Sequence, residues 1–126
     1  MSASRKQVLV VEDNLLVVVL YRQFLPNLNC DIVAEVRNGA DALDVFRSKK
    51  VDLIIMDIMI EGEVDGVDTV KTIREESEVP VIFISGNSDT INFDRVEGIS
   101  NSTFLPKPAS LDEFVEAMDQ VDFIVD

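Results

Sequence analysis

Five polar side chains stand directly after apolar runs of the chain, where chemically active groups are often found. They are three carboxylates, a hydroxyl and an ammonium group: Glu12, Asp13, Asp57, Ser85 and Lys107. If the apolar runs are parallel strands, their carboxyl ends meet at one edge of a sheet and these groups lie together. Singly, each residue has a plainer interpretation as a helix cap, a strand-end group, a turn former or a surface charge.

Jointly, the three carboxylates predict a cation site. Crowded carboxylates repel one another unless protons or a cation intervene, and Asp57 ends the apolar run Leu53–Met56. Mg²⁺ suits such a place, because it uses one or two carboxylates, keeps water ligands and leaves positions for phosphate oxygens.

Composition excludes several other classes of function. The net charge is −13, so direct binding to nucleic acid is not expected. Histidine is absent and Cys30 is the single cysteine, which excludes imidazole catalysis, an intramolecular disulfide and a zinc site built from clustered thiolates. No apolar run is long enough to span a membrane, so we expect a cytoplasmic protein.

The chain of 126 residues predicts one α/β domain over residues 1–126, with a polar tail at 1–6. Apolar runs and helical stripes alternate five times. The predicted strands are 7–11, 31–36, 53–56, 80–84 and 103–105, and the predicted helices are 14–25, 40–46, 67–76, 88–97 and 110–121. Five such units predict a doubly wound parallel sheet of the flavodoxin-like order 2-1-3-4-5.

Two of the predicted helices have unusual patterns. The apolar stretch Leu15–Leu20 must point around the whole circumference of its helix, so some of it is either exposed for a partner or scattered on the surface. Residues 88–97 have only Ile91 and Val96 as apolar anchors, which predicts a weak helix.

Four short segments resemble the receiver domain of two-component response regulators, the CheY-like group. They are Val-Val-Glu12-Asp13-Asn, Ile-Met-Asp57-Ile, Ile-Ser85-Gly and Leu-Pro-Lys107-Pro108. None is distinctive alone, but their order and their places at strand ends are specific in combination. The resemblance covers nearly the whole chain.

The resemblance implies that Asp57 accepts a phosphoryl group from a phosphohistidine on a sensor histidine kinase or a histidine phosphotransfer protein. Mg²⁺ would be held by Glu12, Asp13, Asp57 and the backbone carbonyl of Met59. Lys107 would offset charge on the phosphoryl oxygens. The protein would not be an enzyme in the usual sense, since it would catalyse only its own phosphorylation and dephosphorylation.

The same resemblance assigns the switch to Ser85 and Phe104. Ser85 would bond a phosphoryl oxygen and Phe104 would turn inward with it; the alternative is that Phe104 is an ordinary core residue. Pro108 would follow a cis peptide bond. The loop 58–66 departs from the family pattern because it lacks the common proline, and Gly62 is expected to supply the turn instead.

We therefore predict a stand-alone switch that signals through a downstream protein target, either as a monomer or as a phosphorylation-dependent dimer. One rival is an aspartyl-phosphate hydrolase of the haloacid dehalogenase type, but its Asp-x-Asp pattern has Met59 in the second place here. The other rival is an interaction module that no longer uses phosphate chemistry.

Overall fold

Five parallel strands form one sheet in the order β2-β1-β3-β4-β5, which confirms the predicted fold class. The computed structural model describes residues 5–60, 62, 64–86, 90–107 and 109–121, with only the backbone of 90–93. The strands are β1 (Lys6–Val11), β2 (Cys30–Val36), β3 (Leu53–Asp57), β4 (Val81–Ser85) and β5 (Ser102–Pro106).

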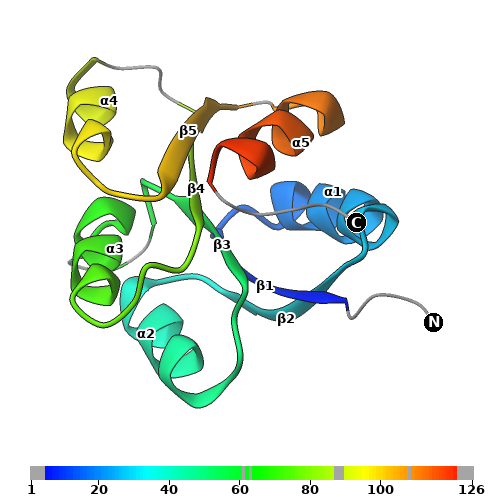
Figure 1. Ribbon diagram of the computed structural model, residues 1–126, viewed down its shortest axis with the longest axis horizontal. Coiled ribbons are helices and arrows are strands. Elements are labelled where there is room, and N and C mark those ends of the chain that lie inside the picture. Colours follow the sequence, from blue (N-terminus) through cyan, green and yellow to red (C-terminus); the bar gives the residue numbers. More distant parts are fainter. Residues whose placement is uncertain (1–4, 61, 63, 87–89, 108, 122–126) are drawn as a thin grey trace.

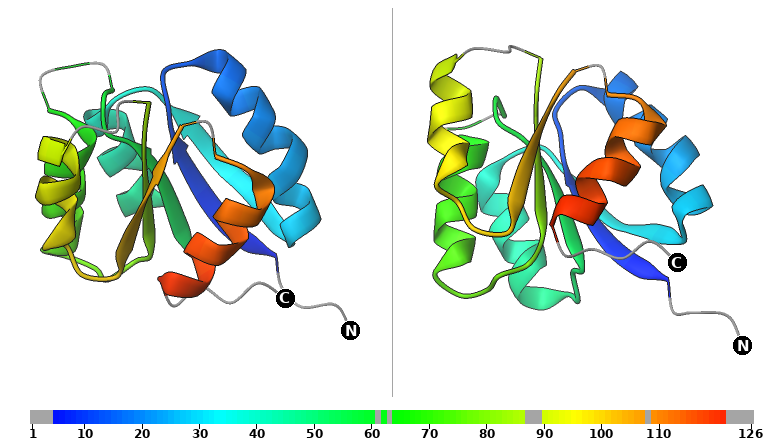
Figure 2. Two further views of the ribbon diagram at one scale, coloured as in Figure 1. Left: turned by 90° about the horizontal axis from the view of Figure 1, so that it is seen from above. Right: turned by 45° about the horizontal axis from the view of Figure 1, so that its top comes forward.

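The helices cover both faces of the sheet (Figures 1 and 2). One face carries α1 (Leu15–Phe24) and α5 (Leu111–Gln120), and the other carries α2 (Gly39–Ser48), α3 (Gly66–Arg74) and α4 (Thr90–Glu97). Right-handed crossovers between parallel strands produce this arrangement. Both β3 and β4 are buried along their whole length, because alternate side chains pack into the two hydrophobic cores, one on each face of the sheet.

Side-chain caps fix the starts of the helices that lead away from the sheet. The Asn14 side chain accepts from the Leu16 N–H at the start of α1. Ser110 and Glu113 form the predicted capping box of α5. After α1 the chain tightens into a 3₁₀ helix over Leu25–Leu28, which we did not predict; Pro26 has no N–H with which to continue the α-helix.

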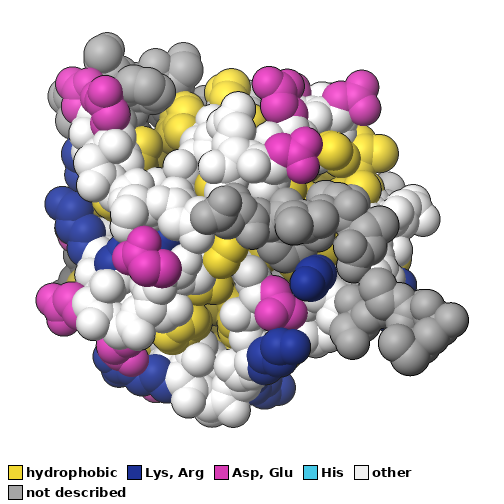
Figure 3. Space-filling model, viewed as in Figure 1, with side chains coloured by type: hydrophobic (Ala, Val, Ile, Leu, Met, Phe, Trp, Pro, Cys, Tyr) yellow, Lys and Arg dark blue, Asp and Glu magenta, His cyan; other side chains and the backbone are white. Residues whose placement is uncertain are grey.

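The apolar stretch of α1 is divided between core and surface. Val18 is buried, whereas Leu15, Leu16 and Leu20 are exposed. Figure 3 shows a hydrophobic patch beside the acidic side chains that cover α5. Among the described residues, no helix combines the length and the apolar character needed to cross a membrane.

The predicted end of the N-terminal tail is corrected. β1 begins at Lys6, so the segment expected to be a tail contributes to the sheet, because the Lys6 N–H bonds the Asn29 carbonyl. Arg5 is also held, through its side chain, by Asp31 at 2.7 Å. α4 begins at Thr90, and residues 88 and 89 of the predicted helix lie outside the described part of the chain.

Candidate phosphorylation and metal site

The carboxyl ends of four strands bring the predicted polar residues to one edge of the sheet. Glu12, Asp13 and Asp57 each place a carboxylate oxygen within 4.8 Å of the others. The Lys107 Nζ atom lies 2.8 Å from Glu12 Oε1 and 3.2 Å from Asp57 Oδ2. Ser85 is buried at the end of β4, and its carbonyl accepts the Lys107 N–H at 2.8 Å.

The loop after Asp57 returns to the sheet through a glycine. The Gly66 N–H bonds the Ile58 carbonyl at 2.9 Å, and a Cβ on Gly66 would lie 2.3 Å from the Asp57 carbonyl oxygen. Only glycine therefore allows α3 to begin this close to the end of β3. Gly62 has a φ of 98°, which agrees with the turn predicted there.

Burial and like charge make Asp57 a perturbed carboxyl group. It is 4% exposed, and its Oδ1 atom accepts the Met59 N–H at 3.2 Å. Burial first, and then the neighbouring Glu12 carboxylate, raise the pKa of Asp57 to about 7, although the Lys107 ammonium acts in the opposite direction. Without a cation, the site therefore resists full ionisation.

Glu12 leaves one oxygen facing the cluster without a hydrogen bond. Its Oε2 atom accepts the Asn14 N–H at 3.1 Å. Its Oε1 atom is buried and has no hydrogen-bond partner among the described residues, since the Lys107 contact is an ion pair without hydrogen-bond geometry. Burial alone would lower the pKa of Lys107, but the contacts with Glu12 and Asp57 raise it.

These oxygens fit a divalent cation. Full ionisation of the three carboxylates beside one ammonium would leave a local charge of about −2, and the buried Oε1 atom has an ion pair with Lys107 but no hydrogen bond among the described residues. Oxygen donors of this kind are the ligands that Mg²⁺ prefers. Met59 bonds Asp57 through its amide, and the ligand role predicted for its carbonyl stays a prediction.

Phe104 lies in the middle of β5, partly buried against the core on the α2–α4 face. This position suits both the predicted switch and the alternative of a core residue, so the switch role stays a prediction. The cis bond predicted at Pro108 falls outside the described residues.

Sequence reasoning missed an ion pair that joins the loop after Asp57 to α4. Arg95 donates to both oxygens of Asp65, at 2.7 and 3.0 Å. Burial alone would raise the pKa of Asp65, but Arg95 and the backbone N–H groups at the start of α3 lower it. No local signal predicts a contact across 30 residues.

Tyr21 was also missed as a neighbour of the site. It is the single tyrosine of the chain, and the helical spacing of Val18, Tyr21 and Leu25 is the signal that indicates its burial. Burial first, and then the charges of Glu12 and Asp57, raise the pKa of Tyr21.

Comparison with known proteins decides the family. The family model of the response regulator receiver domain matches residues 8–119. The chain belongs to this family. It is 31% identical over 116 residues to the polar-differentiation response regulator DivK of Brucella anthropi, covering 90% of this chain and 93% of that one.

Solved receiver domains share the fold. That of a modulated diguanylate cyclase from Desulfovibrio desulfuricans G20 is 29% identical, with a TM-score of 0.83 and 93% of each chain covered. That of a sensor histidine kinase from Pseudomonas aeruginosa PAO1 is 22% identical, with a TM-score of 0.80 and coverage of 93% of this chain and 97% of that one. The latter structure contains a magnesium ion coordinated in its active site cleft.

Proposed function

We propose that this receiver domain is switched by Mg²⁺-dependent phosphorylation of Asp57. The observation that carries the proposal is the convergence of Glu12, Asp13 and Asp57 within 4.8 Å, beside the Lys107 ammonium. A related fold with magnesium in its cleft supports the same ion here. The donor would be a phosphohistidine on a sensor histidine kinase or a histidine phosphotransfer protein, since this chain has no histidine.

Glu12, Asp13, Asp57 and the Met59 carbonyl would hold the ion, which offsets charge on the carboxylates and the phosphoryl oxygens when it is bound. An Asp57 oxygen attacks phosphorus, a P–O bond forms, and the P–N bond to the donor breaks with its electron pair leaving on the imidazole. Lys107 lies 3.2 Å from Asp57, so its positive charge is already beside the acceptor. The chain therefore acts mainly by positioning and charge compensation.

Two residues, Ser85 and Phe104, would then respond to the acyl phosphate. Ser85 is buried at the neighbouring strand end, where its hydroxyl could donate to a phosphoryl oxygen. Phe104 would follow that movement and change the surface offered to a downstream protein target. Loss of the phosphoryl group by the domain's own hydrolysis would reset the switch.

Acetyl phosphate with Mg²⁺ tests this proposal, because it supplies a phosphoryl group without a partner protein. Intact-mass spectrometry should show one added phosphoryl group on the wild type and none on Asp57→Asn. Asp44→Asn, which changes an exposed acid on α2, is the matched control and should be modified like the wild type. Equal modification of Asp57→Asn would defeat the proposal.

A further inference from the structure

The methionines that the structure describes differ in their exposure to solvent. Met56 and Met118 are 0% exposed and belong to the two hydrophobic cores. Met59 is 63% exposed, on the loop that follows the acceptor strand β3. An oxidant in solution can therefore reach the thioether sulfur of Met59 and not those of the two core methionines.

Met59 is also joined to the proposed acceptor. Its N–H donates to Asp57 Oδ1 at 3.2 Å. The Met59 Cα atom is one bond of about 1.5 Å from that nitrogen, so this residue's side chain begins within about 5 Å of the acceptor oxygen. Asp57 itself is only 4% exposed. The water that reaches the Asp57 carboxylate is therefore close to the Met59 side chain.

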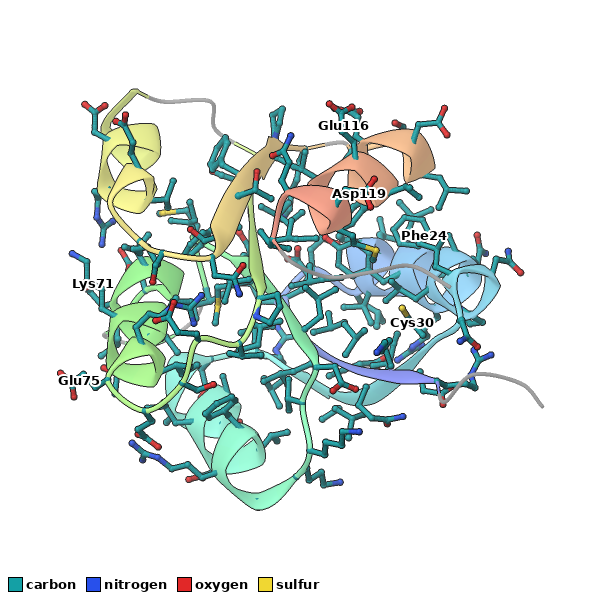
Figure 4. The ribbon with its side chains drawn as sticks, in the orientation of Figure 1. Phe24, Cys30, Lys71, Glu75, Glu116 and Asp119 are labelled. Carbon is teal, nitrogen blue, oxygen red and sulfur yellow. The ribbon has the colours of Figure 1, made fainter. Side chains whose placement is uncertain are left out.

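Cys30 carries the other sulfur that peroxides commonly attack, and it is protected. It is buried in the core on the α1–α5 face, and in Figure 4 it lies among side chains below α1. Burial raises the pKa of the thiol to about 11, so little of the reactive thiolate is present near neutral pH. Among the described residues, Met59 therefore has the sulfur most accessible to a peroxide.

We propose that Met59 is a peroxide-sensitive modification site whose oxidation shortens the lifetime of the phosphoryl group on Asp57. A lone pair of the thioether sulfur attacks one oxygen of hydrogen peroxide, an S–O bond forms, and the O–O bond breaks. The sulfur loses two electrons, and the second oxygen leaves as water after proton transfer. The product is methionine sulfoxide, which methionine sulfoxide reductases convert back to the thioether.

The sulfoxide changes the solvent beside the acceptor, because it replaces an apolar group with a polar one that accepts hydrogen bonds from water. Water held there is close to the acyl phosphate, whose hydrolysis consumes a water molecule. One such hydrogen bond corresponds to about two- to ten-fold in rate. The effect on lifetime rests on the proposed phosphorylation of Asp57, whereas the oxidation of Met59 does not.

Peroxide treatment followed by peptide mapping tests the site itself. After hydrogen peroxide is added to the full chain, mass spectrometry of the digest should show one added oxygen at Met59 and none at Met56 or Met118. This readout needs no phosphoryl group. Oxidation of Met56 or Met118 as fast as that of Met59 would overturn the proposal.

The decay of the phosphoryl group after removal of acetyl phosphate tests the effect, with each protein compared with its own untreated sample. In the wild type, peroxide should shorten the lifetime about two- to ten-fold, and methionine sulfoxide reductases should restore it. Met59→Leu has no sulfur at this place and should keep its lifetime after peroxide. Adding Lys49→Met to Met59→Leu supplies an exposed methionine at the opposite edge of the sheet, where α2 ends, and should not restore the sensitivity.

The outcomes separate this proposal from the phosphorylation on which it rests. A wild type that is phosphorylated but has the same or a longer lifetime after Met59 is oxidised would overturn the present proposal alone. A wild type that takes no phosphoryl group before peroxide would overturn the proposed function as well. A peroxide effect of equal size in Met59→Leu would place the sensitive group elsewhere and would also overturn the proposal.

Discussion

Asp57 and Glu12 are buried carboxylates that share one ammonium, so the metal-free site carries uncompensated negative charge. Such an arrangement costs stability in the absence of a cation, because buried like charges repel. A bound divalent cation removes this repulsion between the carboxylates, and the energy released contributes to the affinity for the cation. The site is therefore suited to binding and not to holding the fold together.

Asp57→Asn should stabilise the metal-free protein. The folded pKa of about 7 lies above the unfolded value of about 3.9. Between these pH values the folded protein holds the Asp57 proton more tightly than the unfolded chain does, so the free energy of unfolding decreases as the pH rises. In EDTA at a pH above 7, urea unfolding should show a gain of about 1–3 kcal/mol for the variant. At pH 4 the gain should nearly vanish.

The exposed Asp44→Asn variant is the control and should change the free energy of unfolding by less than about 0.5 kcal/mol. With saturating Mg²⁺, the advantage of Asp57→Asn should shrink or reverse, since only the wild type has the full set of carboxylates. A metal-free Asp57→Asn protein less stable than the wild type would contradict this description of the site.

At the scale of elements, the start of α3 connects the acceptor strand to α4. Gly66 packs against the Asp57 carbonyl. The preceding residue, Asp65, caps α3 and also binds Arg95 of α4. α3 is therefore held at the site by a close backbone contact, and α4 by an ion pair.

Gly66→Ala should disturb the acceptor strand. The new Cβ would meet the backbone oxygen of Asp57 at 2.3 Å, which requires α3 to shift. We expect a loss of about 1–3 kcal/mol in the free energy of unfolding, together with slower phosphorylation by acetyl phosphate. Gly98→Ala is the matched control: nothing lies within 4 Å of its Cβ, so an unchanged or slightly higher stability is expected.

Arg95→Gln should loosen α4 specifically. The lost ion pair is partly exposed, so its contribution is about 0.5–1.5 kcal/mol, and the amides of 94–97 should exchange up to about ten-fold faster with deuterium. Arg47→Gln breaks the more exposed pair with Glu76 and should leave α4 unchanged. Equal exchange in α4 for both variants would show that the Arg95 pair does not hold this helix.

Strands and helix starts were predictable at this scale because their signals are local. The apolar runs of β3 and β4 indicated strands buried on both faces, and Ser110 with Glu113 indicated the start of α5. The 3₁₀ helix after α1 was not predicted, because Pro26 shows only that the α-helix ends and not how the chain continues.

For the whole molecule, topology alone was enough to predict that the carboxylates converge. Parallel strands of one doubly wound sheet must end at the same edge, whatever their side chains do. The finer contacts depend on packing between distant segments. Lys107 and Glu12 are separated by 95 residues in the sequence, and Arg95 and Asp65 by 30. No local sequence pattern predicts either ion pair.

Mapping the phosphoryl group tests the central claim most directly. The protein would be treated with acetyl phosphate and Mg²⁺, reduced with borohydride to convert the acyl phosphate into a stable alcohol, digested and sequenced by mass spectrometry. We predict modification at residue 57 alone, and none when EDTA replaces Mg²⁺. Modification at Glu12 or Asp13, or equal modification of Asp57 in EDTA, would contradict the account.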